Sequence, residues 1–175
     1  MEHVLVDSDR HCKIVDIGLS KLGIFIPCKA TTHCGTPYCG APEIVKNLPY
    51  DQGVDWWTVG IMIFEMLTGN PTFDYDGIED SGDVSAGDNL DQIIENDEVD
   101  FAKEMTVAAV SIVTQLLMKD PKQRQGSNGS FDAIRQHPFF KGIELKALQE
   151  KRVKPSEKEK LAKNPKRITK DSVRY

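Results

Sequence analysis

The sequence predicts a mainly α-helical domain that carries one small β-hairpin. Residues 54–68 form an apolar run interrupted by only a few polar side chains, among them Asp55 and Glu65. A helix that is hydrophobic on nearly every side is either a core helix or a membrane span. Crossing a bilayer takes about 20 apolar residues, so this shorter run predicts a buried helix. A second helical pattern covers residues 106–118, and two short β-type runs stand near the N-terminus.

The composition is that of an ordinary globular protein. The 175 residues are 39% hydrophobic and 28% charged, which suits one domain with a core of its own. The N-terminus has no secretion signal, and no segment is expected to span a membrane, which indicates a cytoplasmic protein. The cysteines lack zinc-site spacing, so we expect reduced thiols. They are Cys12, Cys28, Cys34 and Cys39.

The net charge of −5 conceals an uneven distribution. Residues 74–100 contain many acids and no Lys or Arg, whereas Lys and Arg outnumber acids more than twofold from residue 141 onward. A basic tail can bind nucleic acid or an anionic membrane. We favour a solvated extension instead, and we expect no nucleic-acid partner. Residues 74–88 and those after Pro155 should be poorly ordered, because they contain few apolar residues.

The first half of the chain predicts a hairpin and then a long loop. Residues 4–7 and 12–15 read as two strands around a turn in which Arg10 stands where glycine would be easier. Residues 23–49 show little periodicity, and long loops inside compact domains are usually functional or disordered.

The helix of residues 54–68 should end at Gly69, which can adopt the left-handed conformation. Trp57 and Phe64 should be among its most buried side chains. Asp55, near its start, is either an N-cap or an acceptor for backbone amides of a neighbouring loop. The remaining elements expected are an exposed loop at 74–88, a short helix at 89–98, a helix at 106–118 that Thr106 caps, and a short helix at 131–137 that Pro138 stops.

Four segments, in this order, resemble the C-terminal lobe of a protein kinase. They are Lys13–Gly18, with the pattern K-I-V-D-I-G; Thr32–Pro37 with Ala41-Pro42-Glu43; Asp55–Gly60, with D-W-W; and Asp120–Gly126 with His137-Pro138-Phe139-Phe140. Within the kinases the pattern is similar to the AGC group and the protein kinase C family. The acidic insert before Asn89–Ile94, together with Phe131-Asp132-Ala133-Ile134, is most similar to the atypical branch of that family.

The resemblance implies a mainly α fold, a kinase-like C-terminal lobe with a β-hairpin. Residues 1–148 would be a partial kinase domain, and residues 149–175 a degenerate tail of the AGC type. Asp16 matches the aspartate that binds magnesium, and His3 stands where the family has a second metal ligand, an asparagine. Magnesium prefers oxygen ligands, so His3 is a weak match.

The resemblance also assigns roles downstream of the metal aspartate. Thr32 matches the activation-loop phosphorylation site, which an upstream kinase would modify. The substrate loop would be formed by Gly35, Thr36 and Pro37. Glu43 and Arg124 match a buried ion pair behind that loop. Asp55 would accept amide hydrogen bonds from the catalytic loop, and Trp57 would be structural.

The implied activity is transfer of phosphate from MgATP to Ser or Thr of protein substrates. This polypeptide contains no Gly-rich phosphate loop, no strand lysine and no H-R-D base, so we expect it to be inactive by itself. Three interpretations stay open: a piece of a longer kinase, a pseudokinase that binds kinase-pathway proteins, or a decayed gene product. Five residues depart from the family pattern, and together they favour a pseudokinase or a decayed gene product over an active enzyme. These residues are His3, Arg10, Cys39, Gly40 and Gln125.

Overall fold

The computed structural model describes residues 3–7, 11–24, 27–73 and 85–153. These residues belong to two compact units. A helical unit runs from Asp16 to Gly142, and a smaller unit combines residues 2–15 with residues from 143 onward. Most of the predicted acidic loop, the turn around Arg10 and the region after Pro155 lie outside the described residues. The predicted domain boundary at residue 148 stays a prediction.

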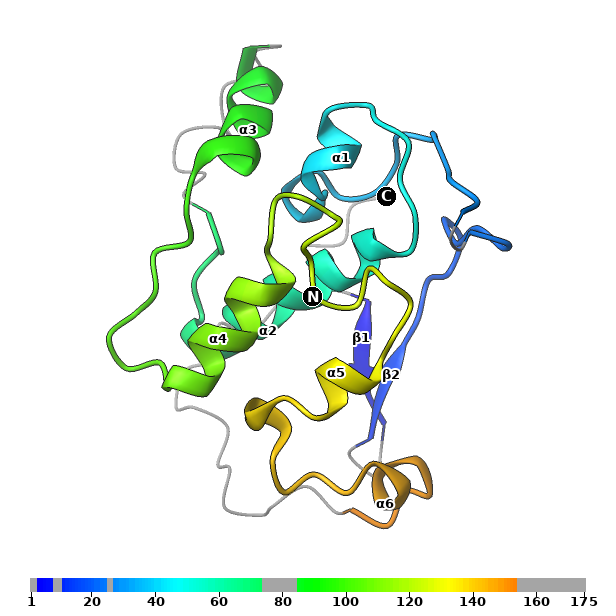
Figure 1. Ribbon diagram of the computed structural model, residues 1–175, viewed down its shortest axis with the longest axis vertical. Coiled ribbons are helices and arrows are strands. Elements are labelled where there is room, and N and C mark those ends of the chain that lie inside the picture. The colour runs from blue at the N-terminus through cyan, green and yellow to red at the C-terminus, as the bar shows by residue number, and fades with distance from the viewer. Residues whose placement is uncertain (1–2, 8–10, 25–26, 74–84, 154–175) are drawn as a thin grey trace, which may run out of the picture. The chain divides into compact units, whose positions relative to one another are not determined.

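The smaller unit contains the predicted hairpin (Figure 1). Strand β1 (Val4–Val6) pairs antiparallel with β2 (Cys12–Ile14), and Leu5 lies opposite Lys13. At the turn, the Asp7 amide donates to the His11 carbonyl at 2.9 Å. The same unit holds the short helix α6 (Leu145–Gln149). The hairpin prediction is confirmed, with each strand one residue shorter than expected.

The centre of the helical unit is α2 (Gly53–Thr68), the predicted core helix. Trp57 is 0% exposed and Phe64 is 4% exposed, as predicted. The helix ends where the sequence predicts, since Gly69 has φ = 71° and its amide donates to the Glu65 carbonyl at 2.8 Å. A left-handed residue at this position satisfies a carbonyl of the last turn and stops the helix.

Burial of α2 is nevertheless one-sided. Met66 and Leu67, near its C-terminal end, are exposed. The buried side packs on α4 (Val107–Leu116), which lies alongside α2 in Figure 1. The contact is close because α2 presents a glycine there: a Cβ on Gly60 would lie 2.8 Å from Leu117 Cδ2. The expectation that apolar residues would be buried all round the helix is therefore wrong at its last turn.

Helix α4 begins as the sequence predicts. The Thr106 side chain accepts a hydrogen bond from the Ala109 amide at 3.2 Å, which satisfies one of the free donors of the first turn. The core-facing side chains Ile112, Val113 and Leu116 are each 0% exposed. The apolar residues at helical spacing therefore form the second wall of the core.

Several boundaries differ from the sequence-based expectation. The long loop of residues 23–49 contains the 3-10 turn η1 (Pro37–Cys39) and the helix α1 (Pro42–Val45). Helix α3 (Ser85–Asn96) begins four residues before the expected start, so residues 85–88 are helical. Pro138 follows α5 (Asp132–Arg135) and begins the 3-10 helix η2 (Pro138–Phe140). Proline suits a first helical position because its fixed φ is already helical.

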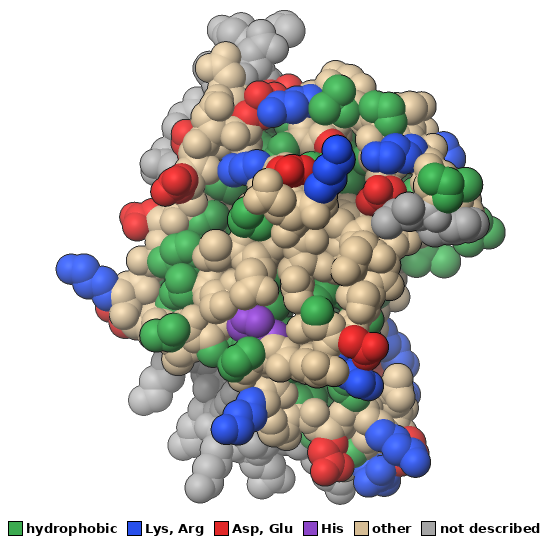
Figure 2. Space-filling view, viewed as in Figure 1, with side chains coloured by type: hydrophobic (Ala, Val, Ile, Leu, Met, Phe, Trp, Pro, Cys, Tyr) green, Lys and Arg blue, Asp and Glu red, His purple; other side chains and the backbone are tan. Residues whose placement is uncertain are grey.

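The described residues include all four cysteines. All four cysteines are free thiols, as expected. Among the described residues, no helix is both long enough and apolar enough to cross a membrane. Basic and acidic side chains are interspersed on the face that Figure 2 presents.

Candidate functional site

A buried ion pair joins the loop after Thr36 to the base of the helical unit. Glu43 lies in the first turn of α1, and Arg124 lies in the segment after α4. Arg124 Nη1 is 2.6 Å from Glu43 Oε1, and Nη2 is 2.8 Å from Oε2, which is a two-pronged contact. The two side chains are 0% and 6% exposed. The pair that the sequence predicts is therefore present and shielded from water.

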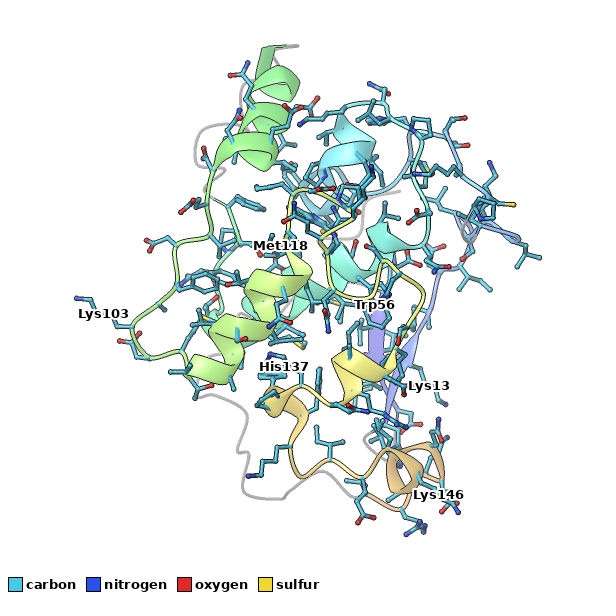
Figure 3. The ribbon with its side chains drawn as sticks, in the orientation of Figure 1. Lys13, Trp56, Lys103, Met118, His137 and Lys146 are labelled. Carbon is cyan, nitrogen blue, oxygen red and sulfur yellow. The ribbon has the colours of Figure 1, made fainter. Side chains whose placement is uncertain are left out.

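Arg124 has further partners that hold it in place. Its Nη1 donates to the Gly53 carbonyl at the start of α2, and its Nε donates to the Met118 carbonyl, both at 3.1 Å. Figure 3 labels Met118 just beyond α4. The guanidinium carbon lies 5.3 Å from the centroid of the Trp57 ring. One side chain thus ties together α1, the start of α2 and the end of α4.

Asp16, the predicted metal ligand, has an unusual backbone. Its φ is +56°, which is a left-handed conformation that non-glycine residues seldom adopt. The residue is exposed, and its Oδ1 accepts a hydrogen bond from the Gly18 amide at 3.4 Å. Aspartate adopts this region more readily than most residues because its side chain can bond the local backbone, and Asn47 and Lys151 also have positive φ values. The geometry is compatible with a functional carboxylate at this position.

The described residues contain no group of three or more His, Cys, Asp or Glu that could hold a metal ion by themselves. Magnesium is usually bound through one or two carboxylates together with phosphate oxygens of a nucleotide. Asp16 fits the part of one such carboxylate. His3 belongs to the smaller unit, where its carbonyl accepts from the Val15 amide at 2.9 Å, and its role as a second ligand stays a prediction.

Thr32, the predicted phosphorylation site, lies in an exposed stretch of loop. Its carbonyl accepts a hydrogen bond from the Tyr50 hydroxyl at 2.7 Å. Next to it, His33 Nδ1 lies 3.1 Å from the Ile44 carbonyl. The loop around Thr32 is therefore tied to residues 44–50, while the threonine residue itself faces solvent.

The predicted substrate loop has one position that requires glycine. Gly35 has φ = 115°, and the Thr36 carbonyl accepts from the Cys39 amide at 3.0 Å as Pro37 opens η1. Cys39 is partly buried, and burial, followed by the nearby Glu65 charge, raises the pKa of its thiol. Cys39 packs against the hydrophobic core, and a thiol with a raised pKa is a poorer nucleophile at neutral pH.

Asp55 does not cap α2. The helix starts two residues earlier, and its N-cap is Gln52, which makes no side-chain capping bond. The Gly53 amide of the first turn donates to Asp51 Oδ1 at 2.9 Å. Asp55 is an exposed residue whose carboxyl is in part shielded, and this desolvation raises its pKa. Its predicted contact with catalytic-loop amides stays a prediction.

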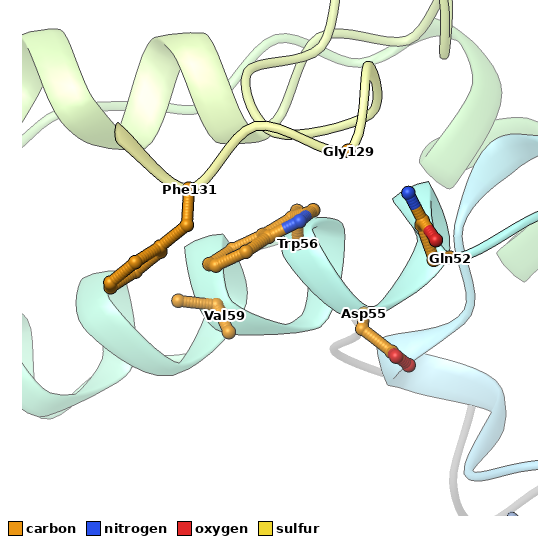
Figure 4. A pocket seen from close by; sticks show the side chains of 6 residues that line it. All are labelled: Gln52, Asp55, Trp56, Val59, Gly129 and Phe131. Carbon is orange, nitrogen blue, oxygen red and sulfur yellow. The ribbon is translucent and has the colours of Figure 1, made fainter. Parts of the chain in front are cut away.

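A pocket of about 350 Å³ lies beside Asp55, and the sequence gives no sign of it. Trp56 and Phe131 stack with ring centroids 5.9 Å apart, and Val59 lies close to both (Figure 4). The Asp55 side chain points away from the indole in this view. The two rings are far apart in the chain, so only the folded loop before α5 brings them together. The remaining lining residues are Gln52 and Gly129.

Ser111, Gln115 and His137 form a polar network that the sequence alone does not indicate. Ser111 Oγ lies 3.1 Å from His137 Nε2 and accepts from Gln115 Nε2 at 2.9 Å. His137 Nδ1 accepts from the Phe139 amide at 3.2 Å (His137 is labelled in Figure 3). A neutral imidazole that accepts at Nδ1 carries its proton on Nε2, so His137 donates to Ser111. It cannot act as a base toward this serine, and the network is structural.

Comparison with known proteins agrees with these motifs. Residues 1–140 match the model of the protein kinase domain family. The chain is 38% identical over 165 residues to protein kinase C of Drosophila melanogaster and 39% identical over 159 residues to the epsilon type of protein kinase C from rabbit, Oryctolagus cuniculus. It is 36% identical over 163 residues to atypical protein kinase C of Drosophila melanogaster.

These alignments cover 94%, 89% and 92% of the chain. The chain spans only 21%, 20% and 27% of the respective relatives. The three sequence identities are too similar to one another to favour the atypical branch over the other branches of the protein kinase C family. The family match over most of the chain, together with the buried Glu43–Arg124 pair, leads to one conclusion: this chain belongs to the protein kinase domain family and is homologous to the protein kinase C enzymes.

Proposed function

We propose that this chain is the C-terminal lobe of a serine/threonine kinase of the protein kinase C type. In this role it contributes to phosphate transfer from MgATP to protein substrates. The observation that carries the proposal is the ordered set of kinase motifs, among which Glu43 and Arg124 form the buried pair that the resemblance implies. The resemblance to the atypical branch rests on the insert before Asn89 and on Phe131–Ile134, and the sequence identities do not single out that branch, so the proposal covers the whole protein kinase C family.

The proposed roles divide between the metal and the substrate. Asp16 would bind a magnesium ion that also contacts ATP phosphates, and ATP would supply the transferred phosphoryl group. Gly35, Thr36 and Pro37 would lie beside the acceptor hydroxyl, on a loop that Glu43 anchors. Thr32 would receive a regulatory phosphate from an upstream kinase, where a phosphate orders a loop through nearby basic groups. An intracellular, cytoplasmic location fits the free cysteines.

One residue favours a second candidate, a pseudokinase that binds kinase-pathway proteins. His3 replaces the asparagine that would supply an oxygen ligand to the second metal. An imidazole there would weaken magnesium binding while leaving the helical unit intact. The same fold could then serve as a binding module or a decoy for kinase partners.

A chimera distinguishes the two candidates. Residues 2–140 would replace the matching segment of the kinase domain of rabbit protein kinase C epsilon, to which the chain is 39% identical. We expect phosphorylation of a basic serine peptide that Asp16→Asn abolishes. His3→Asn should raise the rate at limiting magnesium. A folded chimera that binds substrate yet stays inactive even with His3→Asn would favour the pseudokinase and contradict the kinase proposal.

A further inference from the structure

The loop around Thr32 is closed at its base by a single pair of residues. The Ala30 amide donates to the Tyr50 carbonyl at 2.7 Å, and the Tyr50 amide donates to the Ala30 carbonyl at 2.9 Å. Ala30 is 1% exposed, although the residues on both sides of it are exposed. The two ends of residues 30–50 are therefore held together at this backbone pair, and farther along the loop Glu43 is held by Arg124.

Tyr50 makes a third bond, and it reaches Thr32. The tyrosine hydroxyl donates to the Thr32 carbonyl at 2.7 Å, a normal length for a hydroxyl donor. A tyrosine hydroxyl with its ordinary pKa of 10.0 is protonated at neutral pH and can donate, and burial, followed by the nearby Cys34, raises the pKa of Tyr50 further. One residue thus fixes the backbone at positions 30 and 32.

This closure is connected to the core helix. Asp51, the next residue, accepts through Oδ1 from the amide of Gly53, in the first turn of α2, at 2.9 Å. The Asp51 carboxylate also lies 3.8 Å from Lys29 Nζ, on the other side of the Ala30–Tyr50 pair. The backbone pair, the hydroxyl bond and the ion pair all oppose separation of residues 29–32 from residues 50–51.

We propose that Tyr50 is a positioning residue for Thr32 and that its hydroxyl acts as a latch on the loop. An enzyme that modifies a loop must draw the chain into its own active site, which requires local opening. The latch keeps the Thr32 backbone bound to Tyr50 and so limits how often Thr32 can enter such a site. This inference rests on the proposed role of Thr32 as a phosphate acceptor, but the latch itself can be tested without phosphorylation.

The first experiment uses limited proteolysis of the full chain. Trypsin can cut after Lys29 only when the Ala30 amide has left the Tyr50 carbonyl. Tyr50→Phe removes the hydroxyl and keeps the ring, and Tyr38→Phe removes the hydroxyl of another tyrosine in the same loop. We expect Tyr50→Phe to speed cleavage after Lys29 about fivefold, the population change expected for one lost hydrogen bond. Cleavage after Lys21, which lies outside residues 30–50, should not change.

The outcomes separate a latch from a general loss of stability. Faster cleavage after Lys29 alone, with an unchanged melting temperature, supports the latch. Equal acceleration after Lys21 and Lys29, or equal effects of Tyr50→Phe and Tyr38→Phe, would overturn it.

The second experiment tests the consequence for Thr32. In the chimeric kinase described above, expressed in animal cells, mass spectrometry would measure the fraction of Thr32 that carries phosphate. We expect Tyr50→Phe to increase this fraction. A decrease would overturn the limiting role. If Thr32 carries no phosphate in either chimera while the protease result holds, the latch stands and the proposed acceptor role of Thr32 fails.

Discussion

At the scale of single residues, the Glu43 carboxylate and the Arg124 guanidinium lie 2.6 Å apart and are shielded from water. Removing one member of a buried pair leaves the other charge without its partner, which costs about 3–5 kcal/mol. Glu43→Gln should therefore lower the free energy of unfolding by about that amount in urea titrations. Glu104→Gln, at an exposed glutamate, is the matched control and should change stability little. Similar losses in both variants would contradict the importance of the pair.

Lys119 is a residue that the sequence did not single out. Its Nζ donates to the Ile94 carbonyl and lies 4.5 Å from the centroid of the Phe73 ring and 5.3 Å from that of Trp57. Burial lowers the pKa of this amine to about 8. Nearby Asp97 and Glu98 favour the charged form, and Lys46 opposes it, but burial dominates.

The lowered pKa of Lys119 predicts that the stability of the folded chain depends on pH. The unfolded chain binds the proton up to the ordinary lysine pKa of 10.5, whereas the folded chain releases it near 8. Stability should thus rise with pH between about 8 and 10.5, and the cost of the buried charge is present in full below pH 8.

The variant Lys119→Met removes this titration and keeps a long side chain. Compared with the parent chain, it should be at least as stable at pH 7, and its advantage should shrink at pH 10. Urea unfolding of both proteins at the two pH values measures the difference. A clear loss of stability at pH 7 would mean that the aromatic and carbonyl contacts outweigh the burial cost.

At the scale of elements, the fit between the loop before α5 and helix α2 depends on Gly126. This glycine has φ = 89°, and a Cβ there would lie 2.6 Å from Trp56 Cδ1 and 2.8 Å from Ile134 Cδ1. Gly142 has φ = 90°, but a Cβ there would meet nothing within 4 Å. The two positions share the same backbone conformation and differ only in packing.

Alanine substitutions at these two glycines separate strain from overpacking. Gly142→Ala should cost about 1–2 kcal/mol, the penalty for a left-handed L-residue. Gly126→Ala adds overpacking against Trp56, for a total of about 2–5 kcal/mol. Thermal melts of both variants measure the difference. Equal losses would mean that the loop yields and that the contact with Trp56 is not tight.

The same elements explain how much of the fold the sequence could predict. Helices α2 and α4 were predicted because apolar periodicity and end signals such as Thr106 and Gly69 are local. The start of α3 was missed because residues 85–88 have the Gly, Ser and Asp composition of a loop. The short α1 was missed because four residues are too few to show a period. Met66 is exposed, which its local sequence does not indicate, because burial depends on which segments pack against the last turn of α2.

The candidate site was predictable to the extent that its residues fall within recognisable motifs. Asp16, Thr32 and Glu43 could be named in advance because their neighbours form kinase-like patterns. Tyr50, Lys119 and the Trp56–Phe131 stack could not, because their contacts join segments that are distant in sequence. The hydrogen bond from the Gly53 amide to Asp51 could not be predicted either, because the helix begins earlier than the apolar run indicates.

At the scale of the whole molecule, the question is what this polypeptide can do alone. Phosphate transfer needs groups that bind the triphosphate, a metal and a base close to the acceptor hydroxyl. The sequence contains Asp16 but no Gly-rich phosphate loop and no H-R-D base. In the smaller unit, Asp7 lies 3.3 Å from Lys13 Nζ and accepts from the His11 amide, so it serves the hairpin.

We therefore expect the isolated 175-residue chain to transfer no phosphate. Each missing electrostatic group costs orders of magnitude in rate, and several are missing from this polypeptide together. The measurement is transfer of labelled phosphate from MgATP to a basic serine peptide, beside an Asp16→Ala control. The chimera with the kinase domain of protein kinase C epsilon serves as the positive control, because there the other lobe is supplied. Turnover by the isolated chain above the Asp16→Ala background would contradict this expectation. It would mean that residues of this chain take the place of the phosphate loop and the catalytic base.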